Sequence, residues 1–307
     1  MRTTITLLLA IVLLASCNQY QTTKSGVKYK LTAGGSKETL KQGQYVKYNL
    51  EYKTGKDSVL QSSYGHIATY MIMDTAKVGK HSFFELLTKL APGDKVEFVL
   101  SVDSLKKLGF IEYNNIFKAK DLIKGRAEII KTFPSQIEAL ADVQKEQDAE
   151  KTKEIKELQD YAAKKGIKTQ STVSGVLVEV TNAGDVQKAD SGKQVQVLYR
   201  GGFMDGKGFD SNTNKNQPNR MPLIVNVGSQ GGEHSVIKGM DDALRLFGKG
   251  GKGRLFIPAM LGYGPYPNPP IPAYSNLIFD VEVLDVVTPA PQPAAAAPVA
   301  PGATPRK

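Results

Sequence analysis

Apolar and polar residues alternate along much of the first half of the chain, with the period expected of half-buried β-strands. Four stretches carry the alternation most clearly: residues 29–31, 45–52, 96–102 and 122–130. Between the second and third of these, four apolar residues recur at i, i+3, i+4 and i+7, namely Phe83, Leu86, Leu87 and Leu90. That spacing predicts an amphipathic helix, which Pro92-Gly93 ends. The pattern indicates a sheet packed on one short helix.

The same order of patterns returns in the second half. Strand-like stretches lie at residues 176–180, 195–201, 223–227, 255–257 and 277–287, and a short helix is predicted at 240–247. The apolar stripe of this helix has the spacing of the first one: Met240, Ala243, Leu244 and Phe247. Tyr199 and Gly206 have the same separation as Tyr48 and Gly55. We interpret the two regions as divergent copies of one fold.

The segment between the two copies has a different composition. Residues 135–165 are rich in Glu, Lys, Gln and Ala, which favour a helix, and the middle of this segment, 144–154, carries almost no apolar residue. A helix that is polar all round bridges solvent or is weakly stable, so we predict a connecting helix ended by Gly166. A dimer-forming coiled coil is the alternative. Its heptad pattern is poor, so dimerisation stays open without support from the sequence.

The chain begins with a pattern that is typical of export. Residues 5–15 are almost wholly apolar, but this run is too short to span a bilayer as a helix. It ends in Leu14-Ala15-Ser16-Cys17, which resembles the bacterial lipoprotein processing box. We therefore predict lipidation of Cys17, which would anchor the protein to a membrane surface. An ordinary signal peptide with a chance cysteine is the alternative.

Composition and charge exclude several classes of function. The formal net charge is +10, but the lysines are scattered and no nucleic-acid reading motif is present. The three histidines, His66, His81 and His234, lack metal-ligand spacing, and Cys17 is the only cysteine. The glycine-rich segments lack the Lys-Ser/Thr pair of a phosphate-binding loop. We expect no metal, no cofactor and no nucleic-acid partner.

One ordered set of short motifs carries the chemistry of the second copy. It comprises residues 195–201 (VQVLYRG), 205–211 (DGKGFDS), 222–228 (PLIVNVG), 236–240 (VIKGM), 255–258 (LFIP), 261–264 (LGYG), 271–272 (IP) and 277–282 (LIFDVE). In order and spacing this set resembles the FKBP-type peptidyl-prolyl cis-trans isomerases, over roughly residues 175–287. Each piece is weak by itself, whereas the ordered set is specific.

The resemblance implies an α+β fold class: two FKBP-like curved antiparallel sheets, each wrapped on a short helix, joined by a long charged helix. It divides the chain into a lipoprotein signal peptide (1–17), a tether (18–24), a degenerate FKBP-like domain (25–133), a helical linker (134–167), a catalytic domain (168–288) and a disordered Pro/Ala-rich tail (289–307).

The resemblance also implies an activity, the rotation of Xaa-Pro bonds, which amide resonance opposes with a barrier of about 18–20 kcal/mol. The twisted imide is less dipolar than the planar one, so an apolar, aromatic-lined pocket with few donors favours it. By resemblance, the Tyr263 hydroxyl and the Ile237 backbone N–H are donors to the substrate, and Asp210 hydrogen-bonds within the rim. The implied pocket residues are Tyr199, Phe209, Leu223, Val225, Val236, Met240, Ile271 and Phe279.

Two of these positions depart from the family pattern. Met240 stands where the family often has Trp, and Leu223 stands where an aromatic residue is common. Methionine is apolar and adaptable, so a pocket floor is retained. The departures leave open the catalytic rate and the affinity for macrolide inhibitors, which the resemblance implies as ligands.

The first copy departs further from the family. Aligned by spacing, Val59-Leu60 replaces Phe209-Asp210, and Lys106 falls near the place of Tyr263. On this alignment the aromatic lining and the hydroxyl donor are both missing. We therefore predict a non-catalytic domain that binds clients or partners, or that has a structural role.

Together these observations predict a lipid-anchored folding catalyst of the cell envelope whose substrates are proline-containing segments of unfolded proteins. Residues 18–21 carry no acidic side chain, so we expect an outer-membrane anchor that faces the periplasm. The linker would hold the domains apart, so that one catches a client while the other isomerises it. Two alternatives stay open: a non-catalytic chaperone or envelope scaffold, and a surface lipoprotein whose tail contacts other envelope components.

Overall fold

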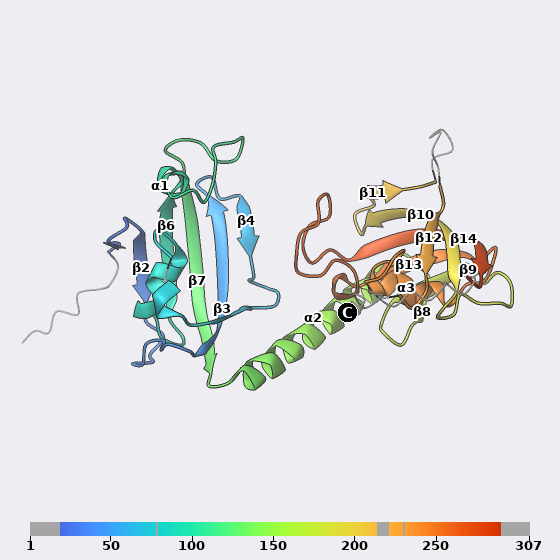
Figure 1. The fold of residues 1–307 in the computed structure, drawn as a ribbon, viewed down its shortest axis with the longest axis horizontal. Helices are drawn as coiled ribbons and strands as arrows, with labels where there is room; N and C mark the ends of the chain where they lie inside the picture. The colour runs from blue at the N-terminus through green and yellow to red at the C-terminus, as the bar shows by residue number, and fades with distance from the viewer. Residues whose placement is uncertain (1–18, 78, 214–220, 230, 290–307) are drawn as a thin grey trace, which may run out of the picture. The chain divides into compact units, whose positions relative to one another are not determined.

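The computed structural model describes residues 19–77, 79–213, 221–229 and 231–289 (Figure 1). The chain divides into two compact units, Met1–Gln147 and Asp148–Lys307, here unit 1 and unit 2. The predicted lipidation site Cys17 and all but the first residue of the predicted tail (289–307) lie outside the described residues. Within the described ranges, no helix combines the length and apolar character that crossing a membrane requires.

Unit 1 contains an antiparallel sheet whose described strands follow the order β1-β2-β6-β7-β3-β4, with β5 paired to β3. These strands are β1 (Gln21–Thr22), β2 (Lys28–Thr32), β3 (Tyr45–Thr54), β4 (Val59–Ser62), β5 (Thr69–Ile72), β6 (Lys95–Ser101) and β7 (Leu122–Phe133). The helices of the unit are the 3-10 helices η1 (Thr75–Lys77) and η2 (Phe83–Lys89) and the α-helix α1 (Val102–Lys107). Strand β1, which pairs with β2, lies in the segment for which the sequence predicts a tether.

The core of unit 1 forms between one face of the sheet and η2. Phe83, Leu86 and Leu87 of η2 are buried there, and the positions of β6 alternate between exposed and buried. The predicted apolar stripe is therefore buried as expected, but on a 3-10 helix and not on an α-helix. Seven residues are too few to gain much from α-helical cooperativity, so packing decides the local geometry.

Unit 2 contains a second antiparallel sheet, with the described strands in the order β11-β10-β14-β13-β9-β8 and β12 paired to β10. Its strands are β8 (Gln170–Ser171), β9 (Leu177–Asn182), β10 (Gln194–Phe203), β11 (Gly208–Ser211), β12 (Leu223–Asn226), β13 (Lys252–Ile257) and β14 (Leu277–Val287). Helix α3 (Lys238–Leu244) packs on this sheet, and the 3-10 helix η3 (Ala259–Leu261) follows β13. The predicted α+β class is confirmed, since each antiparallel sheet packs on a short helix and α2 (Gln136–Lys164) lies between them in the chain (Figure 1).

The strand registers show which residues of the two units correspond. In β3 a bulge precedes Tyr48, which pairs with Ile129 of β7. In β10 the equivalent bulge precedes Val197, which pairs with Val283 of β14. Tyr48 therefore corresponds to Val197, and its predicted match to Tyr199 is wrong by two residues.

The turn that follows these strands shows the same two-residue error. Asp57 and Gly206 both have positive φ angles, 66° and 88°, and the N–H of each donates to the carbonyl of the last residue of the preceding strand. Asp57, and not Gly55, thus corresponds to Gly206. Equal spacing of a tyrosine and a glycine misled the alignment, because register in a sheet is set by bulges and pairing.

Helix α2 is bound to the sheet of unit 1 by polar contacts. Nζ of Lys47, on β3, lies 2.6 Å from carboxylate oxygens of both Asp142 and Glu146, and the Tyr70 hydroxyl donates to Asp142 at 2.6 Å. Burial lowers the pKa of Lys47, but these hydrogen bonds outweigh that effect and hold its pKa above the ordinary value. The first half of the helix is therefore attached to the sheet by ion pairs.

The second half of α2 packs on the sheet of unit 2 through apolar contacts. Leu158 of the helix is fully buried with Leu177 of β9 and Phe256 of β13. Those two strand residues alternate with Val178 and Leu255, which face the core that contains α3. The helix therefore covers the face of the sheet opposite to α3. Its polar middle, which the sequence predicts to be surrounded by solvent, contains residues that bind to one of the two units.

Candidate functional site

Three aromatic rings from three adjacent strands form the centre of the predicted site in unit 2. Phe209 of β11 contacts Phe279 of β14 edge to face, with ring centroids 5.6 Å apart and an interplanar angle of 85°. The centroids of Tyr199, on β10, and Phe279 are 6.0 Å apart. Gly201 makes room for this arrangement, because a Cβ there would lie 2.7 Å from ring atoms of both phenylalanines.

A tyrosine-carboxylate pair lies at the edge of these rings. The Tyr199 hydroxyl donates to Oδ2 of Asp210 at 2.5 Å. Burial, the hydrogen bond and the carboxylate charge together raise the pKa of Tyr199 above its ordinary value. The pair orients both side chains, as the sequence resemblance implies for Asp210.

Tyr263 lies in the loop after η3 and is 39% exposed. Burial, and then the negative charge of Asp210, raise the pKa of Tyr263, so its hydroxyl stays protonated as a donor near neutral pH. The Tyr263 hydroxyl also acts electrostatically on Tyr199, raising the pKa of Tyr199. Two predicted catalytic side chains, Tyr263 and Asp210, therefore lie within electrostatic range of each other.

The remaining predicted positions form the apolar surroundings of the rings. Val225, Met240 and Ile271 are buried in the core of unit 2, and Leu223, Val236 and Ile237 are partly buried against it. Ile237 is the N-terminal cap of α3, and no acceptor for its backbone N–H is found among the described residues. The structure thus brings the predicted pocket residues into one cluster, while their roles toward a substrate remain predictions.

Two further residues support this site and were not found by the sequence pattern. Asn212 accepts from the Tyr199 backbone N–H at 2.7 Å and donates to the Val197 carbonyl at 3.0 Å, which fixes the strand around the tyrosine. Gly201 supplies the space under the rings. A glycine inside a strand marks a close approach of other groups, so Gly201 was detectable, whereas Asn212 had no signal in the sequence.

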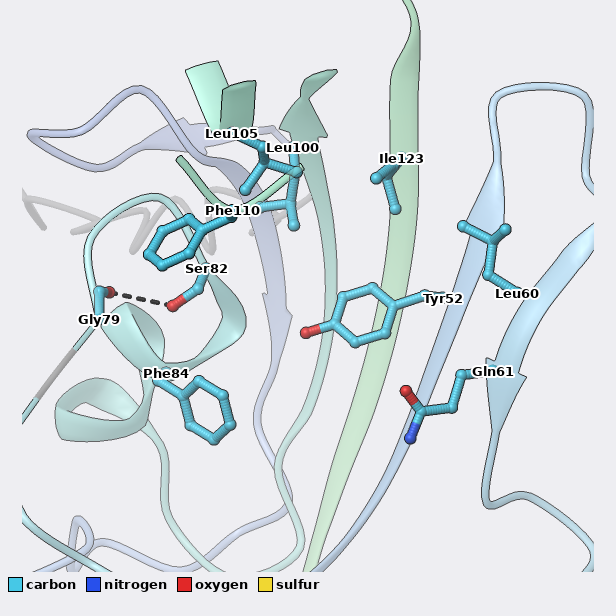
Figure 2. A pocket seen from close by; sticks show the side chains of 10 residues that line it. All are labelled: Tyr52, Leu60, Gln61, Gly79, Ser82, Phe84, Leu100, Leu105, Phe110 and Ile123. Atoms are coloured by element: carbon cyan, nitrogen blue, oxygen red, sulfur yellow. Dashed lines mark hydrogen bonds between the residues drawn. The ribbon is translucent and has the colours of Figure 1, made fainter. Parts of the chain in front are cut away.

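Unit 1 contains an apolar pocket of about 480 Å³ (Figure 2). The residues lining it are Tyr52, Leu60, Gln61, Gly79, Ser82, Phe84, Leu100, Leu105, Phe110 and Ile123. Figure 2 shows Tyr52 between Phe84 and Phe110 on one side and Leu60 and Gln61 on the other. Its volume lies within the range of small-ligand sites.

The pocket of unit 1 occupies the place that the predicted site has in unit 2. Gln61 pairs with Tyr52 as Asp210 pairs with Gly201, so Leu60 and Gln61 stand at the positions of Phe209 and Asp210. The predicted replacement by Val59-Leu60 is wrong by one residue.

The expected loss of all aromatic lining in unit 1 is also wrong. Tyr52, Phe84 and Phe110 line the pocket, and burial raises the pKa of Tyr52 to about 12, so that its hydroxyl remains a donor. Lys106, which spacing placed near the position of Tyr263, lies in the helix α1, whereas Tyr263 lies in a loop, and Lys106 is paired with Glu112.

Comparison with known proteins identifies the family of this frame. A model of the FKBP-type peptidyl-prolyl cis-trans isomerase family matches residues 185–284. The FKBP-type peptidyl-prolyl cis-trans isomerase FkpA of Escherichia coli is 36% identical over 169 residues, which cover 54% of this chain and 57% of that protein. The chain thus spans little more than half the length of this relative. A crystal structure of FkpA from Escherichia coli is 30% identical and covers 51% of this chain and 69% of that one, with a TM-score of 0.38.

A second relative is matched over most of its length. The Haemophilus influenzae protein named "Probable FKBP-type peptidyl-prolyl cis-trans isomerase" is 33% identical over 200 residues, covering 60% of this chain and 77% of that protein. Since that match covers most of the relative, and the family model matches the residues that form the site, this chain belongs to the family of FKBP-type peptidyl-prolyl cis-trans isomerases.

Proposed function

We propose that unit 2 catalyses the cis-trans rotation of Xaa-Pro bonds. The observation that carries the proposal is the cluster of Tyr199, Phe209 and Phe279 beside Asp210 and Tyr263, in a chain of this family. The cluster combines apolar rings with two hydroxyl donors. It contains no activated nucleophile, which suits a reaction that breaks no covalent bond.

The proposed mechanism follows from the electronic change during rotation. Twisting the imide removes its resonance, which makes the transition state less dipolar than the planar ground state. Apolar rings disfavour the dipolar ground state relative to water, and donors that fit the twisted geometry add selective stabilisation. Tyr263 and the Ile237 N–H would be these donors, and Asp210 would hold the Tyr199 ring in place.

A peptide assay tests the proposal. The full chain should accelerate cis-trans relaxation of a short Xaa-Pro peptide, and Tyr263→Ala should lower kcat/KM about tenfold or more, since it removes a donor and part of the apolar surface. Tyr266→Ala is the matched control, because Tyr266 lies in the same loop and is largely exposed. A wild-type protein that leaves the spontaneous rate unchanged would favour the alternative of a non-catalytic chaperone or scaffold.

A second role is favoured for unit 1, the binding of client polypeptide. Its pocket is apolar, and exposed hydrophobic side chains, Leu60 and Phe110, lie at its edge. Strand β4 is an edge strand of the sheet, so an extended segment could pair with it while placing an apolar side chain in the pocket.

Adjacent residues of β4 provide a matched test of client binding. Leu60 lines the pocket and Val59 does not, although both are exposed. Leu60→Glu should slow the refolding of a proline-limited protein client and leave the rate on a short peptide unchanged. Val59→Glu should change neither rate. Equal losses for both variants, or a loss on the short peptide, would count against separate roles for the two units.

We further propose that the protein acts in the cell envelope, anchored through a lipid on Cys17 in the outer membrane and facing the periplasm. The support is the apolar run at residues 5–15 followed by the lipoprotein-like box that ends in Cys17. Cys17→Ser should move the protein from the membrane fraction to the soluble fraction of the envelope. An unchanged membrane fraction would remove the lipid-anchor proposal and leave the isomerase proposal intact.

A further inference from the structure

A buried carboxylate of α2 is bonded to the segment that leads to Tyr263. Glu154 is 2% exposed, and its Oε2 accepts from the backbone N–H of Met260, in η3, at 2.9 Å. Its other oxygen, Oε1, has no hydrogen-bond partner among the described residues. A buried carboxylate that is only half satisfied costs free energy. Packing alone therefore does not account for Glu154.

A second carboxylate of the same helix begins a continuous chain of hydrogen bonds. Oε2 of Glu157 accepts from Nδ2 of Asn276 at 3.0 Å, and Oδ1 of Asn276 accepts from the N–H of Ala259 at 3.0 Å. The carbonyl of Ala259 in turn accepts from the N–H groups of the two residues that flank Tyr263, at 2.9 and 2.8 Å. The backbone on both sides of Tyr263 is thus connected to α2.

Unit 1 has a different hydrogen bond at the corresponding position. Val102 stands where Ala259 stands in unit 2, since Leu100 pairs with Ile123 as Ile257 pairs with Leu277. The N–H of Val102 donates to the backbone carbonyl of Asp121 at 3.1 Å, so a main-chain group takes the place of Asn276. In unit 1 this backbone N–H therefore has its acceptor without a carboxylate from α2.

We propose that Glu154 and Glu157 are positioning residues of the isomerase site, which fix the loop that presents Tyr263. The inference rests on the proposed function of unit 2. A donor displaced by a fraction of an ångström stabilises the twisted imide less well, so a loop donor needs support from its surroundings. The linker helix, which the family match at residues 185–284 does not include, would supply that support.

The electrostatics of Glu154 agree with a functional role. Burial raises its pKa to about 7, the Met260 N–H works in the opposite direction, and the charges of Glu150 and Glu157 add to the rise while Lys153 opposes it. Carboxylates with strongly perturbed pKa values gather at functional sites.

A substitution that separates stability from activity tests the inference in the full chain. Glu154→Met fills the same space without a charge, so it should raise the resistance of unit 2 to denaturant. It also leaves the Met260 N–H without its acceptor, so kcat/KM on a short Xaa-Pro peptide should fall about fivefold, the effect of one lost hydrogen bond. A purely structural residue would move both quantities in the same direction.

Two controls complete this experiment. Glu154→Gln retains an acceptor for Met260 and should restore kcat/KM to nearly the wild-type value. Leu158→Ala, one turn further along α2, should lower stability without lowering kcat/KM under conditions where the protein is folded. Wild-type activity in Glu154→Met, or an equal loss in Glu154→Gln, would overturn the inference.

An activity-independent measurement separates this inference from the proposed function. In Glu157→Ala, amide hydrogen exchange at Ala259 and at Gly264 should become faster than in the wild type, because the Asn276 side chain loses its anchor. Unchanged exchange at both amides contradicts positioning by α2, whatever the peptide assay shows. An inactive wild type with the expected exchange pattern would instead reject only the isomerase proposal.

Discussion

In unit 2 the ring of Phe279, on β14, lies over Gly201 of the neighbouring strand β10. In unit 1 the corresponding pair is reversed: the ring belongs to Tyr52 of β3, and the glycine is Gly125 of β7. A second ring of unit 1, that of Phe98 on β6, fills the space over Gly125, and the planes of the Phe98 and Tyr52 rings make an angle of 83°. The same backbone frame therefore receives its aromatic groups from different strands.

This difference shows how one frame carries two kinds of site. Where the ring comes from β14, Tyr199 can hydrogen-bond to Asp210 beside it, and an aromatic cluster with a charged edge results. The equivalents in unit 1 are Leu50 and Gln61, which form no such pair, and the pocket there is apolar and neutral. The fold tolerates the exchange because the cross-strand pair conserves one large and one small residue.

The largest expected effect comes from adding a methyl group at each glycine of this pair. A Cβ at Gly125 would lie 2.1 Å from the ring of the buried Phe98, so Gly125→Ala should destabilise unit 1 by about 3 kcal/mol. Gly201→Ala should cost unit 2 about 2 kcal/mol, because its contacts with two rings are longer, and should also lower isomerase activity. Hydrogen exchange in denaturant reports each unit separately.

Gly208→Ala is the control for both variants, because the nearest atom to its added Cβ would be 3.7 Å away. It should leave the stability of unit 2 unchanged. If Gly125→Ala and Gly201→Ala were both as stable as the wild type, the reversed pair would not be a packing constraint.

The contacts of α2 with unit 1 and its contacts within unit 2 should respond to pH in opposite directions. Glu154 has a folded pKa of about 7 against a usual 4.5, so unit 2 binds more protons when folded and gains about 3 kcal/mol as pH falls from 8 to 4.5. In unit 1, burial raises the pKa of Asp142, but its bonds to Lys47 and Tyr70 outweigh this and hold the pKa below its usual value. That contribution is present above the usual carboxyl pKa and is lost as pH falls through the lower folded value.

Denaturation of the full chain at several pH values, followed by hydrogen exchange in each unit, checks this contrast. Glu154→Gln should abolish the gain of unit 2 at mildly acidic pH and leave unit 1 unaffected. A wild-type unit 2 with equal stability at pH 5 and pH 8 would contradict the buried ionisable state of Glu154.

The smallest expected effects come from the hydroxyl that distinguishes the two sites. Tyr199→Phe removes the hydrogen bond to Asp210 and should lower kcat/KM about tenfold, since bonds to a charged group are strong. The reverse change, Leu50→Tyr with Gln61→Asp, introduces the tyrosine-aspartate pair into unit 1 and is made in a Tyr263→Ala background. It should add no activity, because the side chain of Tyr52 still stands at the position where unit 2 has Gly201 and no side chain. Activity gained by that variant would show that the hydroxyl pair alone decides catalysis.

The amino-acid sequence by itself determined the class of fold and which residues of unit 2 gather in one cluster around the aromatic rings. Alternation, the two apolar stripes and the ordered motifs are local signals, and each is readable without knowing what lies across the sheet. That is why Tyr199, Phe209 and Phe279 were found as a set and are brought together in the structure. The register of the first copy was misread because spacing along a chain does not record where a bulge falls.

Only the tertiary structure decided the features that depend on contacts between distant residues. The reversal of Tyr52 and Gly125 against Gly201 and Phe279, and the connection from Glu157 to the Tyr263 loop, join positions 70 or more residues apart. The acidic residues of α2 were read as a solvated surface because nothing in a local pattern shows which side chain meets a sheet. Burial, hydrogen-bond partners and pKa are properties of the packed environment, so they exist only once the chain has folded.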